Sequence, residues 1–357
     1  MEISTQDKQR QIYLDIDGAM SYAMIWLNGK LIGGWPCPYS SFRLDLTLHL
    51  RFDGEDQLAI RLDNPVESAR WYPGGGLYRN VSLTKVDRVH VGQWGTHFTS
   101  SNITAESATV DVEIFLGNRG ESVSEVSVLT GIFELDLDTG LPGEQKVAKS
   151  EGSVSVEPDG KLSAKYSLEI DCPKIWGPPP TQKPHLYLGV TRLVTKDGRE
   201  FDRYETRFGI RDLMFTGSDG LRVNGQRIRI QGVNEHHDLG AIGAAFNYRA
   251  AERKLEILQE LGVNAIRMAH NPPATELLDL TDKMGFLVIE EIFDSWNLNK
   301  TDNDFHLIFP DWHEQDLRSM IRRDRNHPSI ISWSFGNEVG EQRFPKELAE
   351  IATLCIT

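Results

Sequence analysis

The stretch that decides the fold is IISWSFGNEVG, residues 330–340. Its first six residues are largely β-branched or aromatic, follow Pro328 and end at Gly336, which predicts a short buried strand. An amide and a carboxylate, Asn337 and Glu338, come directly after this strand. In a (β/α) barrel the carboxyl end of each strand lies on the catalytic face. The plainer alternative is that Asn337 is a turn residue and Glu338 an exposed loop residue.

Strands alternate with helices from about residue 227 to the end of the chain. The predicted strands are 228–233, 265–268, 286–291 and 330–335, and the predicted helices are 248–261, 274–284, 312–323 and 346–354. In the first of these helices, Leu255, Leu258 and Leu261 are expected on one face. Successive strand–helix units predict parallel pairing with right-handed crossovers. Residues 211–357 are therefore expected to form the first four units of a (β/α)8 TIM barrel.

The chain before residue 211 contains strands and turns but no predicted helix. In residues 1–90 the pair Asn28-Gly29 is a strong hairpin signal, and evenly spaced strands predict a β-sandwich. In residues 91–210 the segment 109–115 alternates, as expected where one face of a strand packs on a second sheet. Domain boundaries are expected near residues 90 and 210. Trp26, Trp35 and Trp71 are either core aromatics or sugar-stacking rings.

Charge and composition restrict the possible partners. A formal net charge of -14 disfavours nucleic acid and anionic membrane, but a neutral polyol fits. The cysteines Cys37, Cys172 and Cys355 are too far apart to indicate a disulfide framework or a metal site. The first ten residues lack the apolar core of a signal peptide, so no export is encoded here. Localisation stays unknown, with the cytoplasm as the default.

Five segments, in this order along the chain, resemble the family 2 glycoside hydrolases. They are WLNGK at 26–30, RWYPGGGLYRNV at 70–81, GVNEHHD at 232–238, NAIRMAHNP at 264–272 and SWSFGNE at 332–338. This family contains β-galactosidases, β-glucuronidases and β-mannosidases, and HHDLGAIG at 236–243 is most similar to the β-galactosidases. The resemblance implies a jelly-roll sugar-binding domain, then an immunoglobulin-like sandwich, then a catalytic barrel.

The resemblance also implies roles for named residues. Glu338 would be the general acid/base of a retaining glycosidase, which uses a second carboxylate about 5 to 5.5 Å away as the nucleophile. Asn337 would bind the sugar 2-hydroxyl. The remaining substrate-binding candidates follow the first two barrel strands: His236, Asp238, Arg267 and His270. For His237 a structural role is favoured, and Trp296 is either the floor of the sugar site or a packing residue.

The family's nucleophile, a second Glu, belongs to a later barrel strand. Only 19 residues (357 minus 338) follow Glu338, and they predict one helix. The chain is therefore expected to be an internal fragment, incomplete at its front as well, and inactive by itself. The alternatives are a β-glucuronidase-type hydrolase and a carbohydrate-binding or interaction fragment without catalysis. A homo-oligomer or a complementing chain is left open.

A metal site is the other reading of the His and carboxylate residues at the strand ends. Adjacent histidines on an extended chain point to opposite faces, so His236 and His237 cannot easily share an ion. The Glu-x-His pair of magnesium-using β-galactosidases is also missing from Asp294-Ser295-Trp296-Asn297. No metal and no cofactor is therefore expected, and the expected partner is a β-galactoside or related sugar.

Overall fold

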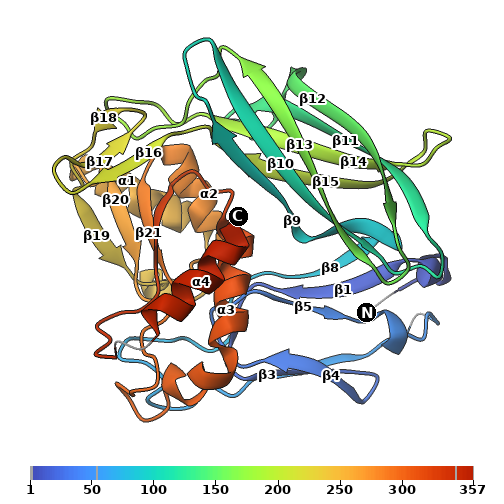
Figure 1. Ribbon diagram of the computed structural model, residues 1–357. Coiled ribbons are helices and arrows are strands. Elements are labelled where there is room, and N and C mark those ends of the chain that lie inside the picture. Colours follow the sequence, from blue (N-terminus) through green and yellow to red (C-terminus); the bar gives the residue numbers. More distant parts are fainter. Residues whose placement is uncertain (1–2, 54, 342–343, 357) are drawn as a thin grey trace.

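The computed structural model describes residues 3–53, 55–341 and 344–356. It is mostly β-structure with four α-helices, which lie in the last third of the chain (Figure 1). Short 3-10 helices occur at Thr5–Gln9, Thr47–His49, Gly240–Ile242 and Phe305–Leu307. Among the described residues, no helix is both long and apolar enough to cross a membrane.

The first β-region packs two three-stranded antiparallel sheets around an apolar core. One sheet has the order β5-β1-β8 and the other β4-β3-β6, with the small pair β2-β7 beside them. The strands are β1 (Gln11–Ile16), β2 (Ala19–Met20), β3 (Ala23–Leu27), β4 (Lys30–Trp35), β5 (Phe42–Asp45), β6 (Leu58–Arg61), β7 (Gly76–Leu77) and β8 (Val81–Val86). Ile12, Leu14 and Ile25 are almost fully buried between the sheets, so this region is a β-sandwich.

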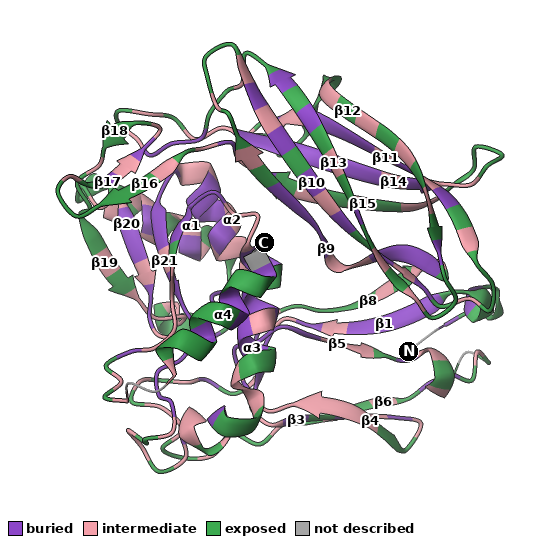
Figure 2. Cartoon of the chain, in the orientation of Figure 1, coloured by how far each residue is buried: buried purple, intermediate pink, exposed green. Residues whose placement is uncertain are grey.

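The second β-region is a larger antiparallel sandwich. Its sheets have the orders β13-β10-β9 and β12-β11-β14-β15. The strands are β9 (Val89–Ser101), β10 (Ser107–Asn118), β11 (Ser124–Leu135), β12 (Pro142–Val156), β13 (Lys161–Asp171), β14 (Leu186–Val194) and β15 (Glu200–Phe208). Val110, Val112 and Ile114 alternate inward along β10, and Figure 2 shows buried positions alternating with half-buried or exposed ones along this strand. The predicted alternation at 109–115 is confirmed.

The last region contains a parallel sheet in the order β19-β20-β21-β22. Its strands are β19 (Gly232–Glu235), β20 (Ala265–Met268), β21 (Leu287–Glu291) and β22 (Ile330–Ser334), and the helices are α1 (Tyr248–Glu260), α2 (Thr275–Met284), α3 (Phe309–Asp324) and α4 (Pro345–Ile356). A small antiparallel sheet precedes it, formed by β16 (Leu213–Thr216), β17 (Gly220–Val223) and β18 (Gln226–Arg227). Sequential parallel strands with intervening helices are the arrangement that the sequence predicted.

Two details of this region differ from the prediction. The expected strand 228–233 is a strand only from Gly232 onward. Residues 228–231 lie outside any strand, and the Ile228 N–H donates to the Leu221 carbonyl oxygen of β17. The expected apolar face of α1 stops at Leu258. Leu261 is six positions after the buried Leu255, about 240° further round the helix, and is 73% exposed.

Candidate active site

The parallel sheet places the carboxyl ends of its four strands along one edge. His236 follows β19, and Asn337 and Glu338 follow β22. Arg267 lies in β20, and His270 lies two residues after the last residue of that strand. The edge of a parallel sheet gathers such residues because all strands run in one direction.

Glu291, the last residue of β21, is the centre of the first contact network. Its side chain is fully buried and accepts hydrogen bonds from Arg267 Nη2 at 2.7 Å, His270 Nδ1 at 2.6 Å and Ser334 Oγ at 2.6 Å. Burial alone would raise the pKa of Glu291, but the hydrogen bonds from His270, Ser334 and Arg267 outweigh it and hold this pKa below its usual range. Glu291 therefore fixes the positions of two predicted sugar-binding residues.

Asp294 is the centre of a second network, which includes Asn337. A single carboxylate oxygen of Asp294 accepts from Arg70 Nη2 at 2.8 Å, Asn337 Nδ2 at 2.8 Å and Lys300 Nζ at 3.0 Å. Asn337 is buried, and its Oδ1 accepts from Arg267 Nη2 at 2.9 Å. Burial would raise the pKa of Asp294, but its hydrogen bonds from Arg70, Asn337 and Lys300 lower it. Asn337 thus links the two networks.

Glu338 differs from the residues around it because its side chain is 72% exposed. Its backbone is in the left-handed region, with φ at +48°, which is uncommon for a residue with a side chain. One Glu338 carboxylate oxygen lies 3.5 Å from Arg70 Nη1. The carboxylate is therefore open to solvent next to a cation, with the buried Asn337 directly before it.

Trp71 joins His236 and His270 through ring contacts. The Trp71 ring centroid lies 5.0 Å from that of His236 and 5.6 Å from that of His270, and the two histidine rings are 5.4 Å apart. The Trp71 indole N–H donates to Tyr39 Oη at 3.2 Å. Burial, and then the nearby His270, lower the pKa of His236. Asp238 is half-buried and acts on this histidine through its charge.

His237 and Trp296, which were considered from the sequence, and Glu290 of β21 lie outside these contacts. His237 packs against Tyr39 and Tyr78, and its Nε2 lies 3.0 Å from the Pro73 carbonyl oxygen. These contacts agree with the structural role that was expected for His237. Glu290 is fully buried near Arg323, on the opposite face of β21 from Glu291. Trp296 is buried against Phe309 and Phe344, which favours packing over contact with a sugar.

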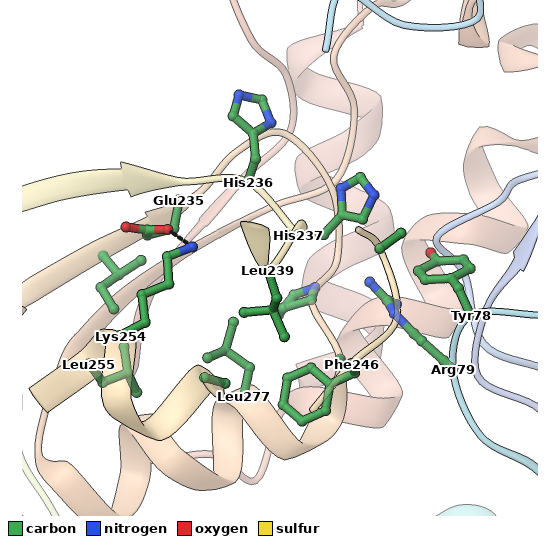
Figure 3. A pocket seen from close by; sticks show the side chains of 15 residues that line it. Tyr78, Arg79, Glu235, His236, His237, Leu239, Phe246, Lys254, Leu255 and Leu277 are labelled. Atoms are coloured by element: carbon green, nitrogen blue, oxygen red, sulfur yellow. Dashed lines mark ion pairs between the residues drawn. The ribbon is translucent and has the colours of Figure 1, made fainter. Parts of the chain in front are cut away.

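A small, mostly apolar pocket lies beside His236 (Figure 3). In Figure 3 His237 lies on the side of Tyr78, whereas His236 lies on the side of the Glu235–Lys254 ion pair. The apolar lining includes Leu239, Phe246, Leu255 and Leu277. Neither Asn337 nor Glu338 lines this pocket, so it lies next to the strand-end site.

Among the described residues, one group has the ligand types and spacing that could hold a metal: Asp279, Asp282 and His327. His327 and the residues after it lie at the amino end of β22, opposite the end that carries Glu338. Asp282 already accepts from His327 Nδ1 at 2.6 Å and from the Ser329 N–H at 3.0 Å. These hydrogen bonds satisfy Asp282 and His327 within the protein, and Asp279 lies 3.4 Å from Arg207.

Arg70 and Lys300 are the site residues that sequence reasoning missed. Arg70 is in the segment 70–81, which contributed to the family resemblance, but a loop of the first sandwich gave no sign that it reaches the barrel. Lys300 follows β21 by nine positions in an irregular loop. Both are recognisable only from the three-dimensional contacts with Asp294.

Two β-sandwiches followed by strand–helix units with polar side chains at one sheet edge define a multidomain protein with a barrel-type enzyme domain. The chain matches two family descriptions: residues 89–211 match "Glycosyl hydrolases family 2", and residues 216–354 match "Glycosyl hydrolases family 2, TIM barrel domain". The protein belongs to glycosyl hydrolase family 2, a family of enzymes. The resemblance seen in the sequence is confirmed.

Individual relatives agree with this assignment. The β-galactosidase BoGH2A of Bacteroides ovatus is 40% identical over 341 residues, which are 95% of this chain and 39% of that protein. A putative β-glucuronidase of Formosa agariphila is 32% identical, covering 94% of this chain and 31% of that protein. The crystal structure of a family 2 member from Bacteroides cellulosilyticus superposes with a TM-score of 0.93 at 34% identity, covering 99% of this chain and 45% of that one. The chain thus spans less than half the length of each.

Proposed function

We propose that this chain carries the acid/base half of a retaining glycoside hydrolase that cleaves terminal β-D-galactosides. Glu338 is the general acid/base in this proposal, and Asn337 binds the sugar 2-hydroxyl. The observation that carries it is the pairing of an exposed Glu338 with a buried Asn337 at the carboxyl end of β22. A residue that exchanges protons with a leaving group and with water needs access to both, and a residue that orients a hydroxyl needs a fixed position.

Asn337 keeps hydrogen-bonding capacity for a sugar. Its Oδ1 accepts from Arg267 and its Nδ2 donates to Asp294. An amide has two acceptor sites and two donor hydrogens, so one of each stays available. The contacts with Arg267 and Asp294 therefore hold the amide in place, and a substrate hydroxyl can still bind to it.

The other proposed substrate-binding residues are Arg267, His270, His236 and Asp238. Arg267 and His270 are oriented by Glu291, and His236 is oriented by Trp71. Cationic and neutral donors held at a strand edge can bind hydroxyls and stabilise charge that develops in the transition state. Trp71 adds an aromatic surface at the same place.

The nucleophile is proposed to lie outside the described residues. Glu291 is fully buried with both carboxylate oxygens hydrogen-bonded, and one oxygen of Asp294 already accepts from three donors. Attack on a sugar needs a carboxylate that can approach the anomeric carbon, and neither residue has that freedom. The 357-residue chain is accordingly expected to be inactive by itself.

The finer domain assignment is part of the same proposal. Residues 1–90 are assigned to a jelly-roll sugar-binding domain, 91–210 to an immunoglobulin-like sandwich and 211–357 to the first four units of an eight-stranded barrel. The strand orders of the two sandwiches and the four consecutive parallel strands support this division. A linker without strand pairing at residues 87–88, between β8 and β9, supports the first boundary.

The galactoside assignment rests on the relative named as a β-galactosidase, which is more similar to this chain than the Formosa agariphila protein is. The second candidate, a β-glucuronidase-type hydrolase, is favoured by the Formosa agariphila relative. A binding fragment without catalysis is the third, and it rests on the missing nucleophile.

Hydrolysis of p-nitrophenyl β-D-galactoside and of the matching glucuronide tests these candidates. We expect a protein of the relatives' length that contains this chain to cleave the galactoside, and Glu338→Gln to lower kcat by about 10²- to 10⁴-fold. The loss should be smallest for leaving groups that need no proton. Glu350→Gln on the exposed face of α4 is the matched control. Preferred cleavage of the glucuronide, or an unchanged rate in Glu338→Gln, would contradict the proposal.

A further inference from the structure

A second cavity, of about 610 Å³, lies where the two sandwiches meet helix α3. Its walls come from β1 and β5 of the first sandwich, β9 and β10 of the second, and one face of α3, elements that lie close together in Figure 1. This volume is in the range of cavities that hold small ligands. None of the proposed catalytic or sugar-binding residues lines it. We call it the junction groove.

The junction groove is strongly cationic although the chain as a whole has a net charge of -14. Its basic lining residues are Arg43, Arg119, Lys161, Arg318, Arg322 and Arg325, whereas Asp45 is the acidic residue of the lining. They come from all three regions of the fold. The positive charge is therefore concentrated by folding and not by a single run of sequence. A concave surface lined by one sign of charge focuses the field and attracts counter-ions.

Part of this charge is not neutralised by carboxylates. Arg43 is paired with Asp15 at 2.7 Å, and Arg318 with Glu314 at 2.7 Å. Arg325 instead donates to backbone carbonyls, which leaves its full charge in place. For Arg322 and Lys161, no ion pair is formed with any part of the chain that the structure describes.

Two groups inside the groove respond to the excess positive charge. Burial lowers the pKa of Arg325, and the charge of Arg322 lowers it further. Burial also lowers the pKa of His90, and the charges of Arg43 and Arg119 act in the same direction. An anion placed among these side chains would relieve the repulsion between them.

Trp94 supplies a flat apolar surface in the same groove. The short turn Gly92-Gln93-Trp94-Gly95 interrupts the pairing of β9 with β10, and Trp94 takes a positive φ of +50°. A side chain at Gly95 would come within 2.5 Å of the Gly92 carbonyl oxygen, so the turn requires glycine there. Within the described part of the chain, the Trp94 ring stacks on no other aromatic ring. A half-buried, unstacked indole beside arginines suits the apolar face of a sugar ring.

We propose that the junction groove binds an anionic oligosaccharide, with uronate or sulfate groups held by the arginines and a sugar ring on Trp94. Guanidinium groups bind carboxylate and sulfate oxygens through paired, charge-assisted hydrogen bonds. The choice of a saccharide as the anion rests on the proposed function, whereas the requirement for negative charge rests on the groove itself. The groove would hold an acidic glycan away from the catalytic edge.

Calorimetric titration of the 357-residue chain tests this, with tetragalacturonate, a sulfated chondroitin tetrasaccharide, cellotetraose and inorganic sulfate as probes. We expect binding of at least one acidic tetrasaccharide, weakened as salt is added. Arg322→Gln and Lys161→Gln should each weaken binding about fivefold, and the double variant by about twentyfold. Both residues lie on the surface, so folding should be unaffected, as a thermal melt would show. Arg253→Gln, an exposed arginine on α1, is the matched control.

Four results would overturn the proposal. If the double variant and the wild type bind the acidic tetrasaccharide with equal affinity, the ligand lies elsewhere. If cellotetraose binds as tightly as the acidic tetrasaccharides, negative charge is not required. If inorganic sulfate binds as tightly as they do, the groove is a simple anion site. Absence of binding by every probe would also reject it. Hydrolysis of the aryl galactoside is measured separately, so failure of the proposed function is distinguishable from failure of the groove.

Discussion

Arg70 of the first sandwich lies between Asp294 and Glu338 of the barrel region, 2.8 Å from the first and 3.5 Å from the second. The candidate active site is therefore shared between two parts of the fold that are more than 220 residues apart in sequence, as the separations of 224 and 268 positions show. Because Asp294 also holds Asn337, a change at Arg70 should reach the sugar-binding amide through this carboxylate.

Arg70→Met is expected to lower kcat/KM by about tenfold in a protein of the relatives' length. Removal of one partner of a hydrogen-bonded charge pair leaves the other partner, here the buried Asp294, less well satisfied. The melting temperature should fall only a little, because Lys300 and Asn337 still donate to Asp294 and the Arg70 side chain is 39% exposed. Steady-state kinetics and a thermal melt measure the two effects.

Arg61→Met is the control for this prediction. Arg61 also lies in the first sandwich and faces an aspartate, Asp63, at 3.9 Å, but both side chains are more than 60% exposed, at 66% and 63%. Loss of activity in both variants would mean that the sandwich is disturbed generally. An unchanged kcat/KM in Arg70→Met would remove Arg70 from the site.

Glu291→Gln is expected to destabilise the fold by about 3 to 5 kcal/mol, because it leaves Arg267 without its buried counter-charge. The pH dependence provides a second measurement. The pKa of Glu291 is lowered in the folded protein, so its contribution to stability is present above the unfolded value of about 4.3 and is lost as the pH falls below it. Urea unfolding between pH 3 and pH 7 should show a smaller acid loss in Glu291→Gln than in the wild type. Equal slopes would contradict the role given to Glu291.

The sequence predicted the elements of the barrel region well because their periodicity is local. The strand 330–335 and the helix 274–284 differ from the structure only at their ends. The interruption of the predicted strand at residues 228–231 was not predictable, since it depends on the Ile228 N–H donating to Leu221 of β17. At the candidate site, Asn337 and Glu338 could be predicted as candidates because they are adjacent in a motif. Arg70 was not, since its partner is a tertiary contact that leaves no local pattern.

His327 is expected to make stability fall as the pH rises above neutrality. Asp282 and other nearby carboxylates raise the pKa of His327 to about 9 against the opposing effect of burial. Because its pKa is higher in the folded protein, His327 contributes to the free energy of unfolding, on the order of 3 kcal/mol. This contribution is fully present below the unfolded pKa of about 6.5 and is lost as the pH rises to about 9. His327→Gln should be less stable at pH 6 and nearly independent of pH between 6.5 and 9. His185→Gln is the control, because burial lowers the pKa of His185 and its titration lies below this window.

The role proposed for Asn337 predicts a specific interaction with one hydroxyl of the substrate. In a protein of the relatives' length, Asn337→Ala should lower kcat/KM for p-nitrophenyl β-D-galactoside by about 10²-fold or more, because a hydrogen bond to the 2-hydroxyl strengthens in the transition state. For the 2-deoxy galactoside, which lacks this hydroxyl, the same substitution should cost much less. The difference between the two losses is the coupling between the amide and the hydroxyl.

The comparison separates this role from a structural one, because Asn337 also links Arg267 to Asp294. A substitution that merely disturbed those contacts would lower the rates of both substrates by the same factor. Ser334→Ala supplies the matched control: Ser334 donates to Glu291 at 2.6 Å, so its loss should weaken the network around Arg267 and lower both rates in parallel. If Asn337→Ala behaves in the same way as Ser334→Ala, the amide positions other residues and does not bind the sugar.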